Sequence, residues 1–322
     1  MEQLLKSYFQ KQQPFGNTKV FDVTLLTDGN SNNHQNYLVE TLGGKYVARI
    51  TKSNDISGYT NLADEFTILK LVEEYHVGPR VFFIDLENFD TPLLCEEYFE
   101  GVSLAEITNP DELMLHSVLE LLLTTSKISL GHEKFPFKFS YTTYETNIQT
   151  WWSRLEEVAQ VLGKGHLLIS EFTSILKQAE EVLRQGDSIL KTTRSEFIYN
   201  DVHPGNVFWL PEERKASFID WQKVSIGDPT FMVALFARRF GEIWNQSATE
   251  FTKKVISEYS KKKNIPNFEE LFYARMLERA VSDMGWSVWA EIKREGSVAI
   301  KRLEENKFYP EVKERLSSVP RN

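Results

Sequence analysis

Three side chains that carry oxygen ligands lie close together in the middle of the sequence. Asp201 comes just after the apolar run "FIY", Asn206 follows five residues later, and Asp220 ends the run "ASFI". Pro204-Gly205 turns the chain back, and "ASFI" is expected to pair with "VFW", so the three side chains can face one cavity. Mg²⁺ prefers such oxygen ligands, and phosphoryl transfer needs a carboxylate beside the attacking hydroxyl.

Each of these residues also has a purely structural explanation. Asp and Asn in tight turns commonly accept hydrogen bonds from the nearby backbone, and any one of the three alone is better explained in this way. Two strand-end acids with an amide between them form a more specific pattern, which favours a metal and phosphate site. The spacing by itself leaves both interpretations open.

Two further features in the first hundred residues suit phosphate binding. Arg49 places a charge on the apolar strand "KYVARIT" and needs a partner, for which Glu65 on a predicted helix is available. The pair could be structural or could hold phosphates. Residues 28–33 are small or polar, so their backbone N–H groups can approach phosphate oxygens, although an ordinary hairpin turn has the same composition. The loop residues singled out are Asp28, Gly29, Asn30, Ser31 and Asn32.

The composition is that of a folded protein without excess positive charge. With 37 basic and 46 acidic residues the formal net charge is −9. This charge argues against a nucleic-acid partner and is compatible with a cationic small substrate. The single cysteine, Cys95, excludes an intramolecular disulfide. No apolar run approaches the roughly 18 residues of a membrane-spanning helix, so no membrane insertion and a cytoplasmic location are expected.

The periodicity of apolar residues changes near residue 100. Before it, short β-branched and aromatic runs predict an antiparallel sheet with a hairpin turn at Gly43-Gly44, together with one helix within residues 61–77. After residue 103, amphipathic segments predict helices, interrupted by a β-rich block at residues 196–224. The predicted fold is α+β, with a β-rich lobe at residues 1–99 and a larger helical lobe at residues 100–322.

The stretches "YNDVHPGN" and "FIDWQKVSIGDP" resemble the signature of the aminoglycoside phosphotransferase and choline kinase superfamily. That resemblance implies a bilobal, protein-kinase-like fold. It also implies that Asp201 is the catalytic base, that Asn206 and Asp220 bind Mg²⁺, and that Asp228 is a structural acid. Tyr199 stands where the family usually has histidine.

Other stretches extend the resemblance over most of the chain. "LLTDGNSNNHQNYLVET" is similar to the family's nucleotide-covering hairpin, "YVARI" and "ADEFTIL" to the strand and helix of its ion pair, and "LLCEEYFEG" to its hinge. The resemblance therefore implies that residues 28–32 cover ATP and that Arg49, ordered by Glu65, contacts its phosphates. The hinge residues implied to meet adenine through their backbone are Glu97, Tyr98 and Phe99.

The acceptor is suggested by tryptophans. "AVSDMGWSVWAEIK" resembles the amine-pocket helix of choline and ethanolamine kinases, with Trp286 and Trp289 on one face. Trp221 and Gln222 directly follow Asp220, the acid that the resemblance implies to bind Mg²⁺. Aromatic faces attract a desolvated quaternary ammonium by roughly 1–2 kcal/mol, although a tryptophan pair on a long helix also serves core packing. The expected acceptor is choline, ethanolamine or a related amino alcohol, and an aminoglycoside is the second choice.

Two departures from the family pattern leave open a second hypothesis, in which the protein is not an enzyme. Besides Tyr199, which together with His203 is expected to support the site from behind, Met232 replaces the second acid of "GDPxxD". A non-catalytic nucleotide-binding protein on the same scaffold would explain both changes. The three site residues are nevertheless all present, so we expect ATP- and Mg²⁺-dependent phosphorylation of a small alcohol. A protein substrate is disfavoured because only six residues separate Asp220 from Gly227, and a homodimer is compatible with the sequence.

Overall fold

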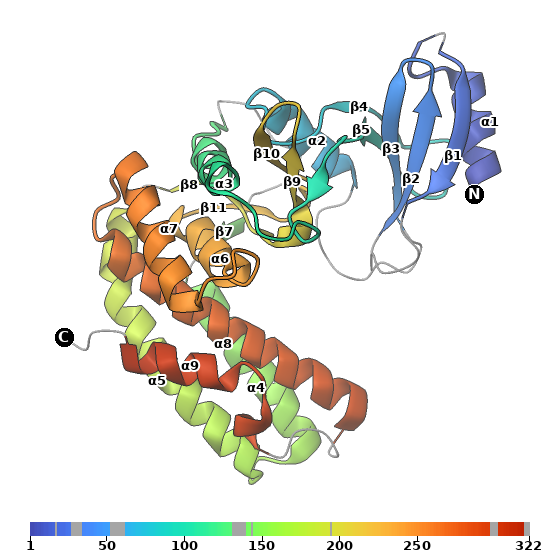
Figure 1. Cartoon of the computed structure of the whole chain (residues 1–322). Helices are drawn as coiled ribbons and strands as arrows, with labels where there is room; N and C mark the ends of the chain where they lie inside the picture. The colour runs from blue at the N-terminus through green and yellow to red at the C-terminus, as the bar shows by residue number, and fades with distance from the viewer. Residues whose placement is uncertain are drawn as a thin grey trace. The chain divides into compact units, whose positions relative to one another are not determined.

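The computed structural model describes residues 1–16, 18–26, 34–51, 62–130, 140–142, 144–193, 195–296 and 302–318. The chain divides into two compact units, one of Met1–Phe139 with Tyr199–Val224 and the other of Ser140–Ile198 with Ser225–Asn322. The predicted α+β class is confirmed, with an antiparallel sheet near the N-terminus and a mainly helical C-terminal part (Figure 1). The lobe boundary expected at residue 99 stays a prediction.

Five strands of the first unit form the antiparallel sheet, in the order β1-β2-β3-β5-β4. In the hairpin between β2 and β3, Thr41 pairs with Gly44, so the turn residues are Leu42 and Gly43. The turn thus lies one position earlier than expected, because Gly44 opens β3 with a φ of 140° that suits glycine. The strands are β1 (Val20–Leu25), β2 (His34–Thr41), β3 (Gly44–Thr51), β4 (Val81–Asp85) and β5 (Leu93–Glu97).

Two helices pack against this sheet. Helix α1 (Glu2–Gln12) buries Leu5 and Phe9 in a core with Ala48 and Ile50 of β3. Helix α1 was not predicted from the sequence, although the i, i+4 spacing of its two buried residues was an available signal. Helix α2 (Leu62–Glu73) is the predicted one, and it contacts β4 and β5.

A second, smaller sheet of the first unit positions the central block of the sequence. Strands β9 (Val207–Leu210) and β10 (Lys215–Phe218) form a hairpin, and β6 (Val102–Ser103) pairs with β9. Helix α3 (Glu112–Ser126) packs against β10, where Ser117 accepts the backbone N–H of Ala216 at 2.7 Å. A side chain at Gly101 would overlap the Trp209 carbonyl, which explains the glycine that ends "EYFEG".

The second unit is mainly helical. A hydrophobic core lies between α4, α5 and α8, and a short sheet has the order β7-β11-β8. Helix α6 was not predicted from the sequence; nearly all of its side chains are buried, and its charged residues, Arg238 and Arg239, both lie in the last turn. None of the described helices is long and apolar enough to cross a membrane. The elements are α4 (Tyr144–Leu162), α5 (Leu167–Thr192), α6 (Thr230–Phe240), α7 (Ala248–Lys262), α8 (Phe268–Glu295), α9 (Tyr309–Ser318), β7 (Ser140–Thr142), β8 (Glu196–Tyr199) and β11 (Val224–Gly227).

Candidate active site

Arg49 lies at the centre of a group of buried charges. Its neighbours in β3, Ala48 and Ile50, face the core formed with α1, so the alternation of the strand directs Arg49 to the opposite face, toward α2. There Nη1 of Arg49 donates to Oε1 of Glu65 at 2.5 Å, and both side chains are almost fully buried. The two residues paired from the sequence are therefore in contact.

Glu96 is a second acid at the same guanidinium group, and it was not singled out from the sequence. It lies on β5, where Leu94 pairs with Arg49, so Glu96 shares their face of the sheet. Its Oε1 atom is 3.6 Å from Nη1 of Arg49. Burial raises the pKa of Glu96 to about 8, because the attraction of Arg49 offsets only part of the desolvation cost and Glu65 adds repulsion. Glu96 therefore keeps its proton at neutral pH.

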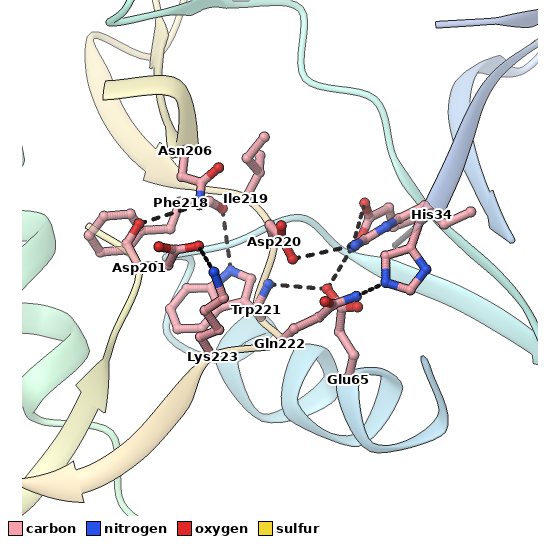
Figure 2. Close-up of polar contacts among 12 residues, drawn as sticks. His34, Glu65, Asp201, Asn206, Phe218, Ile219, Asp220, Trp221, Gln222 and Lys223 are labelled. Atoms are coloured by element: carbon pink, nitrogen blue, oxygen red, sulfur yellow. Dashed lines mark hydrogen bonds and ion pairs between the residues drawn. The ribbon is translucent and has the colours of Figure 1, made fainter. Parts of the chain in front are cut away.

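Asp220 is the third acid near Arg49. Its Oδ1 atom lies 3.4 Å from Nη2 of Arg49, and 41% of its side chain is exposed and so open to a ligand. The backbone of Asp220 has a φ of 58°, which aspartate tolerates better than most residues. Trp221 then donates its backbone N–H to Glu65 at 3.1 Å (Figure 2). Burial lowers the pKa of Arg49, but the neighbouring acidic side chains, Glu65 above all, outweigh it and raise that pKa overall, so Arg49 stays charged.

Asp201 lies in the turn that follows β8. Nζ of Lys223 donates to Oδ2 of Asp201 at 2.8 Å, and Nε2 of His203 lies 3.9 Å from the same oxygen. Nδ1 of His203 accepts the backbone N–H of Gly205 at 3.1 Å, so this histidine also holds the turn. Lys223 was not singled out from the sequence, although its position three residues after Asp220 placed it near the site.

Asn206 joins the two acids of the site. Its side-chain Nδ2 atom donates to the backbone carbonyl of Asp201 at 3.3 Å, and its backbone carbonyl accepts the backbone N–H of Ile219 at 3.0 Å. Because the amide nitrogen is directed at a carbonyl, Oδ1 faces away from it and is left to bind a cation. No cluster of three His, Cys, Asp or Glu side chains within the described ranges could hold a metal. The oxygens of Asn206 and Asp220 fit Mg²⁺, which commonly takes its other ligands from water and phosphates.

Tyr199 supports the backbone next to Asp220. Its hydroxyl donates to the carbonyl of Ile219 at 2.7 Å, and its ring stacks on Phe218 with centroids 4.3 Å apart. Burial, together with the nearby carboxylates of Asp220 and Asp201, raises the pKa of Tyr199 well above its usual value. The residue therefore remains a neutral hydrogen-bond donor behind the site.

The residues expected to meet a nucleotide are described only in part. The loop residues Asp28 to Asn32 lie outside the described residues. Glu97 ends β5, and its backbone N–H donates to the Arg80 carbonyl at 2.8 Å. In the part of the chain that the structure describes, the backbones of Tyr98 and Phe99 make no hydrogen bond. Their peptide groups can therefore pair with the edge of a planar ligand.

Two of the four residues expected to line an acceptor pocket are buried in the interior next to Asp220. Trp221 has no exposed surface, and its ring N–H donates to the Phe218 carbonyl at 3.3 Å. Gln222 is buried and its amide contacts the ring of His34 at the start of β2 (Figure 2). Neither side chain offers a free face to an acceptor in this structure.

The other two expected acceptor residues lie on α8 in the second unit. Trp289 packs against the core of α4, α5 and α8, and its ring N–H donates to Glu157 at 3.0 Å. Trp286, three residues earlier, is 56% exposed, so its ring is accessible. A role for either tryptophan in acceptor binding stays a prediction.

Asp228 is part of a buried network at the start of α6. It accepts the backbone N–H of Thr230 at 2.9 Å and the Nε–H of Arg275 at 2.9 Å. Arg275 is fully buried and also donates to Glu278 at 2.7 Å. Met232, at the position of the family's second acid, is buried in α6 without exposed surface. These contacts are compatible with the structural role expected of Asp228.

The sequence of residues 22–253, which spans both acids of the site and the Arg49–Glu65 pair, matches the model of the phosphotransferase enzyme family. The chain belongs to the phosphotransferase enzyme family. The suspected superfamily and the expected phosphotransferase activity on a hydroxyl acceptor are thereby confirmed. No curated protein sequence matches this phosphotransferase.

Solved structures of other kinases share the fold of this phosphotransferase. A spectinomycin phosphotransferase in complex with ADP and spectinomycin superimposes with a TM-score of 0.59 at 11% identity, over 99% of this chain and 98% of the other. A choline kinase from Cryptosporidium parvum gives 0.62 at 13% identity, over 98% and 93%. An ethanolamine kinase from Plasmodium vivax gives 0.57 at 14% identity, over 92% and 82%. At these identities the similarity shows the fold, and the protein-kinase-like class is confirmed.

Proposed function

We propose that this phosphotransferase moves the γ-phosphate of ATP to an alcohol hydroxyl of a small molecule in a Mg²⁺-dependent reaction. The observation that carries the proposal is the hydrogen-bonded connection between Asp201, Asn206 and Asp220. Asn206 bonds the backbone of Asp201 on one side and the residue before Asp220 on the other. A decayed site would have no need to keep two acids and an amide in this arrangement.

Asp201 is the residue suited to the acceptor. Its side chain is 16% exposed, so the carboxylate is held by its turn and can still be reached by a hydroxyl. As the acceptor oxygen bonds to the γ-phosphorus, its proton passes to Asp201, and the bond from that phosphorus to the bridging oxygen of ADP breaks. The phosphorylated alcohol and ADP leave together with a proton that Asp201 returns to water.

Arg49 and the metal ligands serve the phosphates. Arg49 is kept charged and is held between α2 and β5 by Glu65 and Glu96, so its guanidinium group is pre-positioned for phosphate oxygens. Asn206 and Asp220 would hold Mg²⁺, which when bound neutralises phosphate charge and orients the transferring group. The adenine edge would pair with the peptide groups of Tyr98 and Phe99. Binding of ADP by the structurally similar spectinomycin enzyme supports a nucleotide substrate.

For the acceptor we favour choline, ethanolamine or a related amino alcohol. The net charge of −9 suits a cationic acceptor, and choline and ethanolamine kinases are among the structurally similar enzymes. An aminoglycoside is the second candidate, supported by the similarity to the spectinomycin enzyme. The burial of Trp221 removes one wall of the expected aromatic box, so the preference for amino alcohols rests on charge and on these similarities.

A panel assay tests the proposal. ADP release from Mg·ATP would be followed by a coupled assay with amino alcohols, aminoglycosides and uncharged alcohols as acceptors. We expect acceptor-dependent turnover that requires Mg²⁺ and falls by at least about 100-fold in Asp201→Asn and Asp220→Asn. Asp22→Asn, on an exposed position of β1, is the matched control and should keep full activity.

Two results would redirect the conclusion. Turnover with aminoglycosides alone would show that the acceptor is an aminoglycoside and not an amino alcohol, and the proposed mechanism would still hold. Mg·ATP binding without transfer to any alcohol, equal in wild type and Asp201→Asn, would favour a non-catalytic nucleotide-binding protein.

A further inference from the structure

We propose that Lys223 is a positioning residue for the transfer reaction, which holds Oδ2 of Asp201 so that Oδ1 receives the acceptor's proton. This inference rests on the proposed function and assigns a task to a side chain that the family signature leaves unspecified. Figure 2 shows the lysine ammonium directed at the Asp201 carboxylate.

The backbone places Lys223 beside Asp201. The carbonyl of Lys223 accepts the N–H of Asn200, the residue before Asp201, at 2.7 Å. This bond holds the two segments side by side, so the Lys223 side chain needs to reach only across one strand spacing. Its Nζ atom then lies 2.8 Å from Oδ2 of Asp201, within the range of a charge-assisted hydrogen bond.

The two oxygens of Asp201 have different surroundings. Oδ2 is bound by Lys223, and His203 lies 3.9 Å from the same atom. Within the described ranges of the chain, no hydrogen bond reaches Oδ1. One oxygen of the carboxylate is therefore anchored and the other is left for a hydroxyl.

An anchored carboxylate matters because its terminal torsion is otherwise broad and poorly defined. A general base has to point a lone pair at the hydroxyl from about 2.6–3.2 Å, and a small error in position is costly to the rate. Lys223 is 34% exposed and Asp201 16%, so this ion pair contributes little to folding stability. Loss of Lys223 should consequently lower turnover while leaving the fold intact.

The chemistry assigned to the pair is a proton transfer during phosphoryl transfer. The acceptor's O–H bond breaks and its proton moves to Oδ1 of Asp201, while the acceptor oxygen bonds to the γ-phosphorus and ADP departs. Lys223 keeps its own protons throughout. It stabilises the ionised base before the step and fixes which oxygen faces the acceptor.

Steady-state kinetics of Lys223→Met and Lys223→Arg test the catalytic part. We expect Lys223→Met to lower kcat by about 10- to 100-fold with the KM for ATP unchanged within about twofold, and Lys223→Arg to recover most of the loss. Lys215→Met is the matched control, because Lys215 is similarly exposed at 39% and pairs with Glu213 away from Asp201. A kcat for Lys223→Met within twofold of wild type, with Asp201→Asn inactive, would overturn the proposal.

A second measurement does not depend on turnover. Competitive acetylation with acetic anhydride, read by mass spectrometry, should modify Lys223 several-fold more slowly in wild type than in Asp201→Asn, and Lys215 equally in both. Equal rates for Lys223 in the two proteins would overturn the contact itself. If wild type transfers phosphate to no acceptor, the proposed function fails along with the catalytic part of this inference, and the acetylation result still decides the contact separately.

Discussion

Glu65 on α2 and Glu96 on β5 approach one atom, Nη1 of Arg49, at 2.5 and 3.6 Å. Asp220 lies 3.4 Å from the other terminal nitrogen of the same guanidinium group. Asp220 is partly exposed, but Glu65 and Glu96 are both buried beside a single positive charge, and burial favours the protonated form of Glu96. The arrangement is a shared network rather than a simple ion pair, and its behaviour depends on pH.

The first prediction concerns the pH dependence of stability. Burial raises the pKa of Glu96 from its ordinary value of 4.5 to about 8. Between pH 4.5 and pH 8 the folded chain keeps a proton on Glu96 that the unfolded chain releases. The contribution of neutral Glu96 to the free energy of unfolding is therefore fully present below pH 4.5 and is lost as the pH rises through 8. The slope is at most about 1.4 kcal/mol per pH unit for one proton.

Glu96→Gln keeps the neutral shape and removes this titration. In thermal unfolding scans at pH 6, 7, 8 and 9, we expect the midpoint of Glu96→Gln to rise relative to wild type as pH increases. Glu97→Gln, at the next position on the same strand, should follow wild type at every pH. A constant difference between Glu96→Gln and wild type across this range would contradict a protonated Glu96.

The second prediction concerns the coupling of the two acids. Glu65→Ala removes a partner of Arg49 and the acceptor of the Trp221 N–H, which should cost about 1–3 kcal/mol for the unsatisfied groups. Glu96 can then ionise and take over the guanidinium group, so the loss is limited. The double variant Glu65→Ala/Glu96→Ala should therefore lose more stability than the sum of the single variants.

Urea unfolding of the four proteins in this double-mutant cycle measures that coupling. Glu74→Ala, at an exposed position just after α2, serves as the control and should leave the unfolding midpoint unchanged. Additive losses from the two single variants would show that the acids act independently.

The sequence predicted most of the site because its motifs are local and carry their own geometry. Asn206 and Asp220 flank the paired strands of the β9–β10 hairpin, so their approach follows from that pairing, and Asp201 is brought near by the short turn that separates it from Asn206. Glu96 and Lys223 were missed for a physical reason. Their partners, Arg49 and Asp201, are distant in sequence, and the contacts depend on the register between strands, which a motif does not state.

The fold was predicted less completely where a helix is buried along most of its length. Helix α6 buries nearly all of its side chains, and its charged residues, Arg238 and Arg239, both lie in the last turn, so most of its sequence shows no polar position. The acceptor residues illustrate the converse problem. Trp221 directly follows Asp220, yet its ring is buried against the stacked rings of Tyr199 and Phe218, and packing of this kind cannot be told from ligand binding by residue type.

The third prediction concerns Tyr199. Tyr199→Phe removes the hydroxyl that donates to the Ile219 carbonyl and leaves the ring stack in place. The loss of this buried bond should destabilise the chain by about 1 kcal/mol and lower kcat several-fold, because the backbone before Asp220 is no longer held. Tyr199→His, which restores the residue usual in the family, should retain more activity than Tyr199→Phe in the same assay. Equal activity of wild type and Tyr199→Phe would show that the hydroxyl does not position Asp220.

The fourth prediction tests whether the packing of Trp221 supports Asp220 from behind. Gly78 touches the Trp221 ring so closely that an added Cβ would overlap the indole nitrogen and crowd Val72. Gly78→Ala should therefore push the ring and the adjoining Asp220 out of place, with a loss of about 1–3 kcal/mol in stability and a larger proportional loss of kcat. Gly165→Ala is the matched control, since a Cβ there meets nothing within 4 Å. Thermal unfolding and turnover of the two variants give the comparison. A Gly78→Ala protein that loses stability but keeps wild-type kcat would show that the indole only fills space.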